Sequence, residues 1–282
     1  MHKRGQITIF IILGILVLAT ILIATSISNS VKKEQLQKDA DAALELESKA
    51  NSVKALVENC IEKTGEKAII ILGYRGGKED LVGPYLDEQL FDANYLYNMG
   101  EASAPTVEEM EHSLETLVEE NLKKCTGQIE HSRSLEISPE GVSPELINYN
   151  LLFDSMVAEI GEVNATVKIE DDNTLLTVNW PLLITVGEQE KEITNFPTQK
   201  YDADLEKLSL FSQEFVSKLN YDPYVIDAFY LLEQNYTIDV GLVNNDTYVF
   251  LVTDNSSMID YTPLKFLFAA KVGETPLEEV ET

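Results

Sequence analysis

The sequence predicts an α+β fold with a single N-terminal transmembrane helix, a helical stalk or helix pair, and then an antiparallel sheet with packed helices. Three observations lead to this prediction. Residues 7–27 carry no charged side chain. Apolar residues recur close to the helical spacing of 3.6 in two stretches, 53–69 and 107–125. From residue 165 onward, apolar and polar residues alternate in runs separated by turn-forming residues, which is typical of β-strands.

The uncharged run extends from Ile7 to Ile27 and contains 21 residues. At about 1.5 Å per residue, such a helix is about 31 Å long and matches the hydrocarbon core of a bilayer. A secretory signal that is removed has a shorter apolar core, so we expect the run to be retained. His2, Lys3 and Arg4 precede it, and basic residues are preferentially held in the cytoplasm. We therefore predict a single-pass protein of the cell membrane, with a cytoplasmic N-terminus and an extracytoplasmic bulk.

The N-terminal sequence KRGQIT, followed by a long apolar helix, resembles the class III (type IV pilin-like) signal of archaeal surface proteins. The phrases RGQITIFIILGI, VENCIEKTGEKAIIILGYRGG, WPLLI and FAAKV resemble an uncharacterised group of membrane-anchored surface proteins of archaea. The resemblance implies cleavage between Gly5 and Gln6 by a prepilin-type signal peptidase, with the apolar helix retained. Phe10 departs from the pattern, because many such pilins carry a glutamate there that aligns subunits during assembly. The resemblance therefore supports membrane retention more than filament assembly.

The predicted organisation has six parts. They are a cytoplasmic basic leader (1–6), a transmembrane helix (7–27), a helical stalk (28–50), a helical subdomain with a long loop (51–160), an α+β ectodomain (161–272) and an acidic tail (273–282).

The helical subdomain is predicted from two apolar stripes. The first stripe lies in the C-terminal part of an expected helix at 31–72. The glycines at 73, 76 and 77 terminate this helix. The segment from Tyr74 to Ala104 lacks a period, so we expect an ordered loop carrying Tyr85, Tyr95 and Tyr97. A second helix begins after Pro105 and Thr106. Its apolar face is expected to hold Val107, Met110, Leu114, Leu117, Val118, Leu122 and Cys125.

The ectodomain is predicted from alternating runs at 165–170, 175–186 and 192–201, which form an antiparallel meander. Pro181 lies within the second run and indicates an edge or a bulge. Helices are expected at 202–220 and 224–234, followed by strands at 236–242 and 248–253. The segment 264–272 is a last apolar strand or helix.

Cys60 and Cys125 are the two cysteines of the chain, and each lies on the apolar face of its predicted helix. The extracytoplasmic compartment permits disulfides. We therefore predict a bridge between them, with two buried unpaired thiols as the alternative.

The formal net charge of −27 argues against a nucleic-acid partner, which requires a basic surface. Three histidines and two cysteines are too few for a His/Cys zinc site. The Asp/Asn-rich turns lack the spacing of a calcium loop. No GxSxG, HExxH or GxxxxGK[ST] motif is present. We therefore expect no cofactor, no metal site and no enzymatic activity.

Four sequons in the outer portion are candidates for glycosylation: Asn164, Asn235, Asn245 and Asn255.

These observations favour an anchored extracytoplasmic surface protein with a structural or adhesive role, with a pilin-like subunit as one form. Its expected partners are the bilayer, reached through Ile7–Ile27, the signal peptidase, and copies of itself or other surface proteins. The alternative is an anchored ligand-binding or sensor ectodomain that uses the tyrosine-rich segment 74–104. An anchored hydrolase is a third hypothesis.

Overall fold

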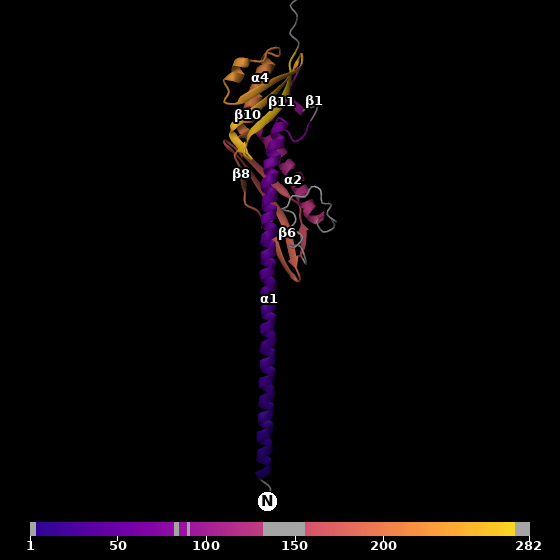
Figure 1. The fold of residues 1–282 in the computed structure, drawn as a ribbon, viewed down its shortest axis with the longest axis vertical. Helices are drawn as coiled ribbons and strands as arrows, with labels where there is room; N and C mark the ends of the chain where they lie inside the picture. Colours follow the sequence, from indigo (N-terminus) through magenta and orange to yellow (C-terminus); the bar gives the residue numbers. More distant parts are fainter. Residues whose placement is uncertain (1–3, 82–84, 89–90, 132–155, 274–282) are drawn as a thin grey trace, which may run out of the picture.

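The computed structural model describes residues 4–81, 85–88, 91–131 and 156–273 (Figure 1). It confirms an α+β protein with helices and two sheets. The elements in chain order are α1 (Arg4–Tyr74), β1 (Tyr85–Glu88), β2 (Phe91–Asn98), β3 (Glu101–Ala102), α2 (Val107–His131), β4 (Met156–Ile160), β5 (Asn164–Glu170), β6 (Asn173–Val186), β7 (Gln189–Asn195), β8 (Gln199–Tyr201), α4 (Leu205–Tyr221), α5 (Ala228–Leu232), β9 (Thr237–Asn244), β10 (Thr247–Ile259) and β11 (Thr262–Lys271).

The helix α1 is a single helix of 71 residues, which corresponds to a length of about 107 Å. Its N-terminal half extends alone from the body, and its C-terminal half runs through the body (Figure 1). From Leu46 onward one stripe of α1 is buried, and this stripe includes Ile61 and Leu72. The helix ends where Gly76 and Gly77 adopt positive φ angles of 63° and 83°, which glycine tolerates best.

The predicted membrane span and the predicted stalk are consecutive parts of α1. The side chains before Lys32 lie outside the described residues, except that of Thr20, and most of the predicted span falls among them. Within the described part of the chain, no helix contains a stretch long and apolar enough to cross a membrane.

A six-stranded mixed sheet forms the end of the body that lies away from the N-terminus (Figure 1). Its strand order is β1-β2-β11-β10-β9, with β3 paired to β2. All its pairs are antiparallel except β2 with β11, which is parallel. The helix α4 covers one face of this sheet, where Phe215 contacts Phe250 and Phe268 at ring-centroid distances of 4.8 and 5.6 Å.

The prediction of a long loop between Tyr74 and Ala104 is wrong, because this segment contains β1, β2 and β3. Strand β2 pairs with β11, more than 150 residues further along the chain, so no local pattern marks the pairing. One sheet thus takes β1, β2 and β3 from the segment 51–160 and β9, β10 and β11 from the segment 161–272.

The second sheet is the predicted meander. Strands β4 and β5 pair with successive parts of β6 along one edge, and β7 and β8 do so along the other. The register shifts between Asn179 and Leu182, so Pro181 lies at an irregularity of the central strand. Nearby, Trp180 Nε1 donates to the carbonyl of Gly161 at 3.0 Å.

One face of the meander is buried against α1 and α2, and the other is largely exposed. Every second residue of β6 is buried, as its alternation predicts. The helix α2 contacts β5, and α1 contacts β6, β7 and β8. One hydrophobic core extends from Leu46 on α1 through this layer to Phe266 and Phe268 on β11. The long N-terminal helix is thus a central part of the folded body.

Candidate functional site

The outer edge of β5 is covered by carboxylates of α2. Strand β5 pairs with β6 along its inner edge. Along its outer edge, three backbone N–H groups donate to three glutamates of α2: Ala165 to Glu119 at 2.9 Å, Val167 to Glu115 at 3.1 Å and Ile169 to Glu111 at 2.8 Å. We call these three glutamates the glutamate ladder.

The ladder fits because two periods match. Four residues of a helix rise about 6.0 Å, and two residues of a strand rise about 6.6 Å. Glutamates at every fourth position of α2 therefore meet every second N–H of β5, with helix and strand running in opposite directions. An unpaired strand edge is a template for pairing with other chains, and the ladder closes this one.

Strand β9 is the opposite case. It ends the six-stranded sheet and pairs along one edge with β10. Within the described part of the chain, its outer edge has no strand or helix against it. All eight of its residues are exposed or half-buried. The structure therefore closes one sheet edge and leaves another accessible.

Exposed apolar side chains gather in the segment that contains β9. The side chains of Phe229 and Leu232 on α5 are 81% and 82% exposed, and those of Val240 and Leu242 on β9 are 46% and 62% exposed. Isolated surface apolar residues are common in soluble proteins, but nine of the fifteen large exposed ones in the described chain lie between residues 219 and 264. They are Tyr221, Tyr224, Val225, Phe229, Leu232, Val240, Leu242, Met258 and Tyr261.

The same segment has a one-sided charge. Residues 219–264 contain no Lys, Arg or His, although they contain seven acidic residues. These are Asp222, Asp227, Glu233, Asp239, Asp246, Asp254 and Asp260. Lysines outside the segment pair with two of them, Lys271 with Asp246 and Lys63 with Asp260. The segment thus combines exposed apolar surface with a negative charge that is partly offset.

A buried polar cluster holds β10 to the start of α4. The carboxylate of Asp254 accepts from the hydroxyls of Ser256 and Ser257, both at 2.6 Å, and from the Ser256 N–H at 2.9 Å. The Ser257 hydroxyl in turn accepts from the backbone N–H of Asp204, at 3.0 Å. Asp204 caps α4 by accepting from the N–H of Lys207.

This environment sets the ionisation of the cluster. Burial acts to raise the pKa of Asp254, but the hydrogen bonds from Ser256 and Ser257 outweigh it, so the pKa lies below its usual range. Burial, together with the charges of Asp254 and Asp204, raises the pKa of Tyr236 to about 12. Asp254 is thus a buried, ionised carboxylate whose hydrogen bonds fix the backbone of β10.

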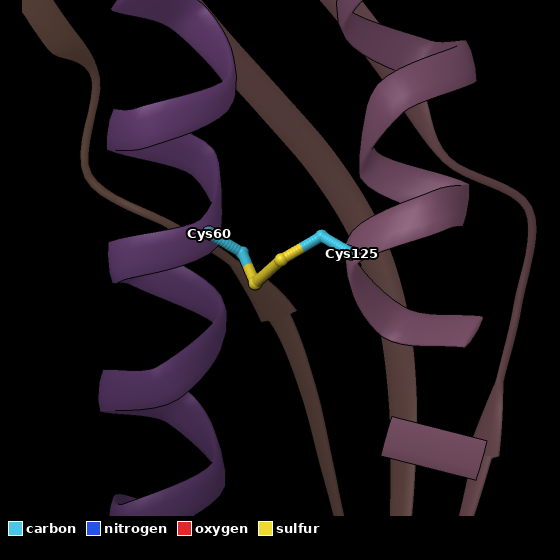
Figure 2. Close-up of a disulfide and its surroundings, with 2 residues drawn as sticks. All are labelled: Cys60 and Cys125. Carbon is cyan, nitrogen blue, oxygen red and sulfur yellow. A yellow bond between two sulfur atoms is a disulfide. The ribbon is translucent and has the colours of Figure 1, made fainter. Parts of the chain in front are cut away.

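A disulfide joins Cys60 of α1 to Cys125 of α2, with their Cα atoms 6.3 Å apart (Figure 2). The two side chains meet between the helices (Figure 2). Cys60 is buried, and Cys125 is half-buried against the core. The bridge ties the long helix to the helix that carries the glutamate ladder.

The other predicted site residues lie apart from one another. Gly5 and Gln6 lie in the first turn of α1, and their side chains are outside the described residues. The four sequon asparagines are all exposed. Asn164 begins β5, Asn235 and Asn245 flank β9, and Asn255 donates from Nδ2 to Thr237 Oγ1 at 3.1 Å.

The tyrosines expected to line a loop lie on strands instead. Tyr85 is exposed on β1, Tyr95 is half-buried on β2, and Tyr97 is buried in the core. Among the described residues, no three His, Cys, Asp or Glu side chains come together as a metal site would require.

Sequence reasoning missed the glutamate ladder and the open edge of β9. Glu111, Glu115 and Glu119 recur at intervals of four, and this spacing is the signal in the sequence that could have identified the ladder. Searches against protein-family models, curated proteins and solved structures found no match for this chain.

Proposed function

We propose that this chain is a membrane-anchored extracytoplasmic surface protein with a structural or adhesive role, of which a pilin-like subunit is one form. The observation that carries the proposal is the continuity of α1. The uncharged run 7–27 and the buried stripe from Leu46 to Leu72 belong to one helix. The body first contacts α1 at Asp39, whose backbone carbonyl accepts from Gln189 of β7. If the run lies in a bilayer, residues 28–38 hold the body about 17 Å away from it.

Two further features support this role. The Cys60–Cys125 bridge is of the kind that persists in oxidising compartments outside the cytoplasm. The acidic composition suits an exposed body that must remain soluble. No observation favours a ligand-binding ectodomain built on the tyrosines, because Tyr97 is buried and Tyr85 is exposed elsewhere.

The anchor can be tested in cells that produce the full chain. Alkaline carbonate should leave the protein in the membrane pellet, and external protease should digest the body while leaving a small N-terminal fragment. The N-terminus of the mature protein should be Gln6, and Gly5→Val should prevent that cleavage. Release by carbonate, or full protection of the body, would contradict the anchor and its orientation.

Assembly can be tested separately with introduced thiols. Both native cysteines are in the disulfide, so a third cysteine is the sole free thiol. For a packed assembly, Leu16→Cys in the apolar run should give disulfide-linked dimers in native membranes. Lys200→Cys, exposed on β8, is the matched control. Equal cross-linking at both positions would indicate random collision and contradict specific packing.

A further inference from the structure

We propose that β9 is a docking edge for an extended, basic segment of another protein, which pairs with it as an added strand. The proposal adds a partner class to the surface role. It rests on that role only in placing β9 outside the cell.

The first argument is the contrast between two edges of one molecule. The three glutamates of the ladder occupy the outer N–H groups of β5. Strand β9 has eight residues, and among the described residues it pairs with β10 alone. Its outer backbone groups are therefore available for a new strand, and main-chain pairing of this kind is a general mode of peptide recognition.

The second argument is that β9 carries little of the usual edge protection, since its one irregularity of register lies near its end, at Val243. Natural edge strands that must stay unpaired carry lysine, proline, several charges or a β-bulge, or are very short. The sequence of β9 is TIDVGLVN, which has one charge, at Asp239, and no lysine or proline. At Gly241 an added Cβ would meet nothing within 4 Å, so the face of the sheet is open at this residue.

The third argument concerns side chains. Val240 lies opposite Phe250, and Leu242 lies opposite Tyr248. Directly opposed residues project to the same face of a sheet, and Phe250 contacts Phe215 of α4. Val240 and Leu242 thus project to the face that α4 covers on the neighbouring strands, yet they remain 46% and 62% exposed. Apolar side chains of an added strand would cover both.

Charge selects the occupant. Of the seven acidic residues in 219–264, Asp254 is buried, and Asp246 and Asp260 pair with Lys271 and Lys63. The other four are Asp222, Asp227, Glu233 and Asp239, and a partner strand that alternates apolar residues with Lys or Arg is complementary to them. A second copy of this chain would bring another Asp239 to the edge and a further formal charge of −27. The observations therefore favour a basic partner over self-pairing.

The test uses the full chain in nonionic detergent and a ten-residue capped peptide of alternating valine and lysine. Two control peptides carry glutamate in place of lysine, or proline at the centre. We expect the lysine peptide to bind, to slow amide hydrogen exchange in residues 237–244, and to bind more weakly as salt rises. The two control peptides should bind at least tenfold more weakly.

Variants locate the site. The double substitution of Val240→Lys and Leu242→Lys should lower the affinity at least tenfold, with the unfolding midpoint checked to show that the sheet is intact. Leu210→Lys replaces an exposed apolar residue on α4 and should leave binding unchanged. Equal binding of the glutamate peptide, protection outside 237–244, or a dimer of the unliganded chain that the double variant abolishes would overturn the proposal. The assay needs no membrane, so a failure of peptide binding would leave the anchor standing, and a failure of the anchor would not alter peptide binding.

Discussion

The ring of Tyr201 on β8 occupies the space that a side chain at Gly65 of α1 would need. A Cβ at Gly65 would overlap the tyrosine hydroxyl oxygen and would lie 2.9 Å from ring atom Cε2. The hydroxyl donates to the backbone carbonyl oxygen of Glu62 at 3.1 Å, and the carbonyl oxygen of Ile61 lies 3.3 Å from the same hydroxyl. The glycine thus lets the end of the meander lie directly on the long helix.

This contact reverses an ordinary expectation. In an exposed helix interior, glycine to alanine stabilises by up to about 1 kcal/mol. Here Gly65→Ala should lower the free energy of unfolding by about 1–3 kcal/mol, because Tyr201 must move and lose its bond to α1. Denaturant unfolding followed by circular dichroism measures the change. The double variant with Tyr201→Ala separates the two effects, since alanine at 65 should no longer be harmful once the ring is gone.

The middle glutamate of the ladder gives a second prediction. Glu115→Leu should cost about 1–3 kcal/mol, because the N–H of Val167 loses its acceptor at a partly buried edge. Glu115→Gln keeps an acceptor oxygen and should cost less. Urea unfolding quantifies both. Glu120, exposed on the same helix, is the control, and Glu120→Leu should change stability little. An equal loss at both positions would contradict a specific role for the ladder.

Removal of all three glutamates should change association as well as stability. A variant with Leu at Glu111, Glu115 and Glu119 leaves the outer N–H groups of β5 unpaired, so we expect concentration-dependent oligomers in analytical ultracentrifugation. The triple Gln variant should remain closer to the native chain. An unchanged sedimentation profile for the Leu variant would show that α2 covers the edge without its carboxylates.

Asp254 predicts a pH dependence. Its pKa is lowered in the folded state, so its ionised form contributes stability above the unfolded value of about 3.9 and loses it as the pH falls through the folded pKa. Asp254→Asn should cost about 2 kcal/mol at pH 7, because charged hydrogen bonds are lost. The difference from the native chain should shrink as the pH is lowered below about 4. Urea unfolding across this range, with Asp239→Asn as the exposed control, measures it, and a constant difference would contradict the assignment.

The disulfide gives the last prediction. Cys60→Ala should lower stability by about 4 kcal/mol in the chain-entropy model, because the bridge closes a loop of 65 residues. Cys125→Ala should cost a similar amount, and the double variant should cost little more than either one. A reductant should destabilise the native chain and leave the double variant unchanged. Additive losses would indicate that the two residues act separately.

Local patterns predicted much of this fold. The apolar spacing from Val107 to Cys125 predicted α2 and its buried face, and the alternation around Trp180 predicted β6. Two strands follow one another near 236–242 and 248–253 as expected, and Asn245 and Asp246 form the turn between them, because Asn and Asp favour tight turns. These elements are set by residues within one or two turns of each other, so their signals are local.

Features that depend on distant partners were not predictable in this way. Strand β2 has a local sequence rich in Asp, Asn and Tyr, and it becomes a strand by pairing with β11. The role of Glu115 depends on Val167, which comes 52 residues later. Likewise, position 65 requires glycine only because Tyr201 lies against it. In each case the structure depends on a tertiary contact, and the contacting residue cannot be identified from a single sequence.

The bridge between α1 and α2 also determines how the molecule would respond to being pulled. When a tensile load is applied between the N-terminal end of α1 and β9, the disulfide transmits it directly from Cys60 to Cys125. The chain between the two cysteines, with a sequence separation of 65, cannot be extended while the bridge is intact. The maximum extension of the protein is therefore shorter by about 230 Å, at about 3.5 Å per residue. The part of α1 that follows Cys60, the strands β1 to β3 and most of α2 would therefore be shielded from the load, and extension would be confined to the chain before Cys60 and beyond Cys125.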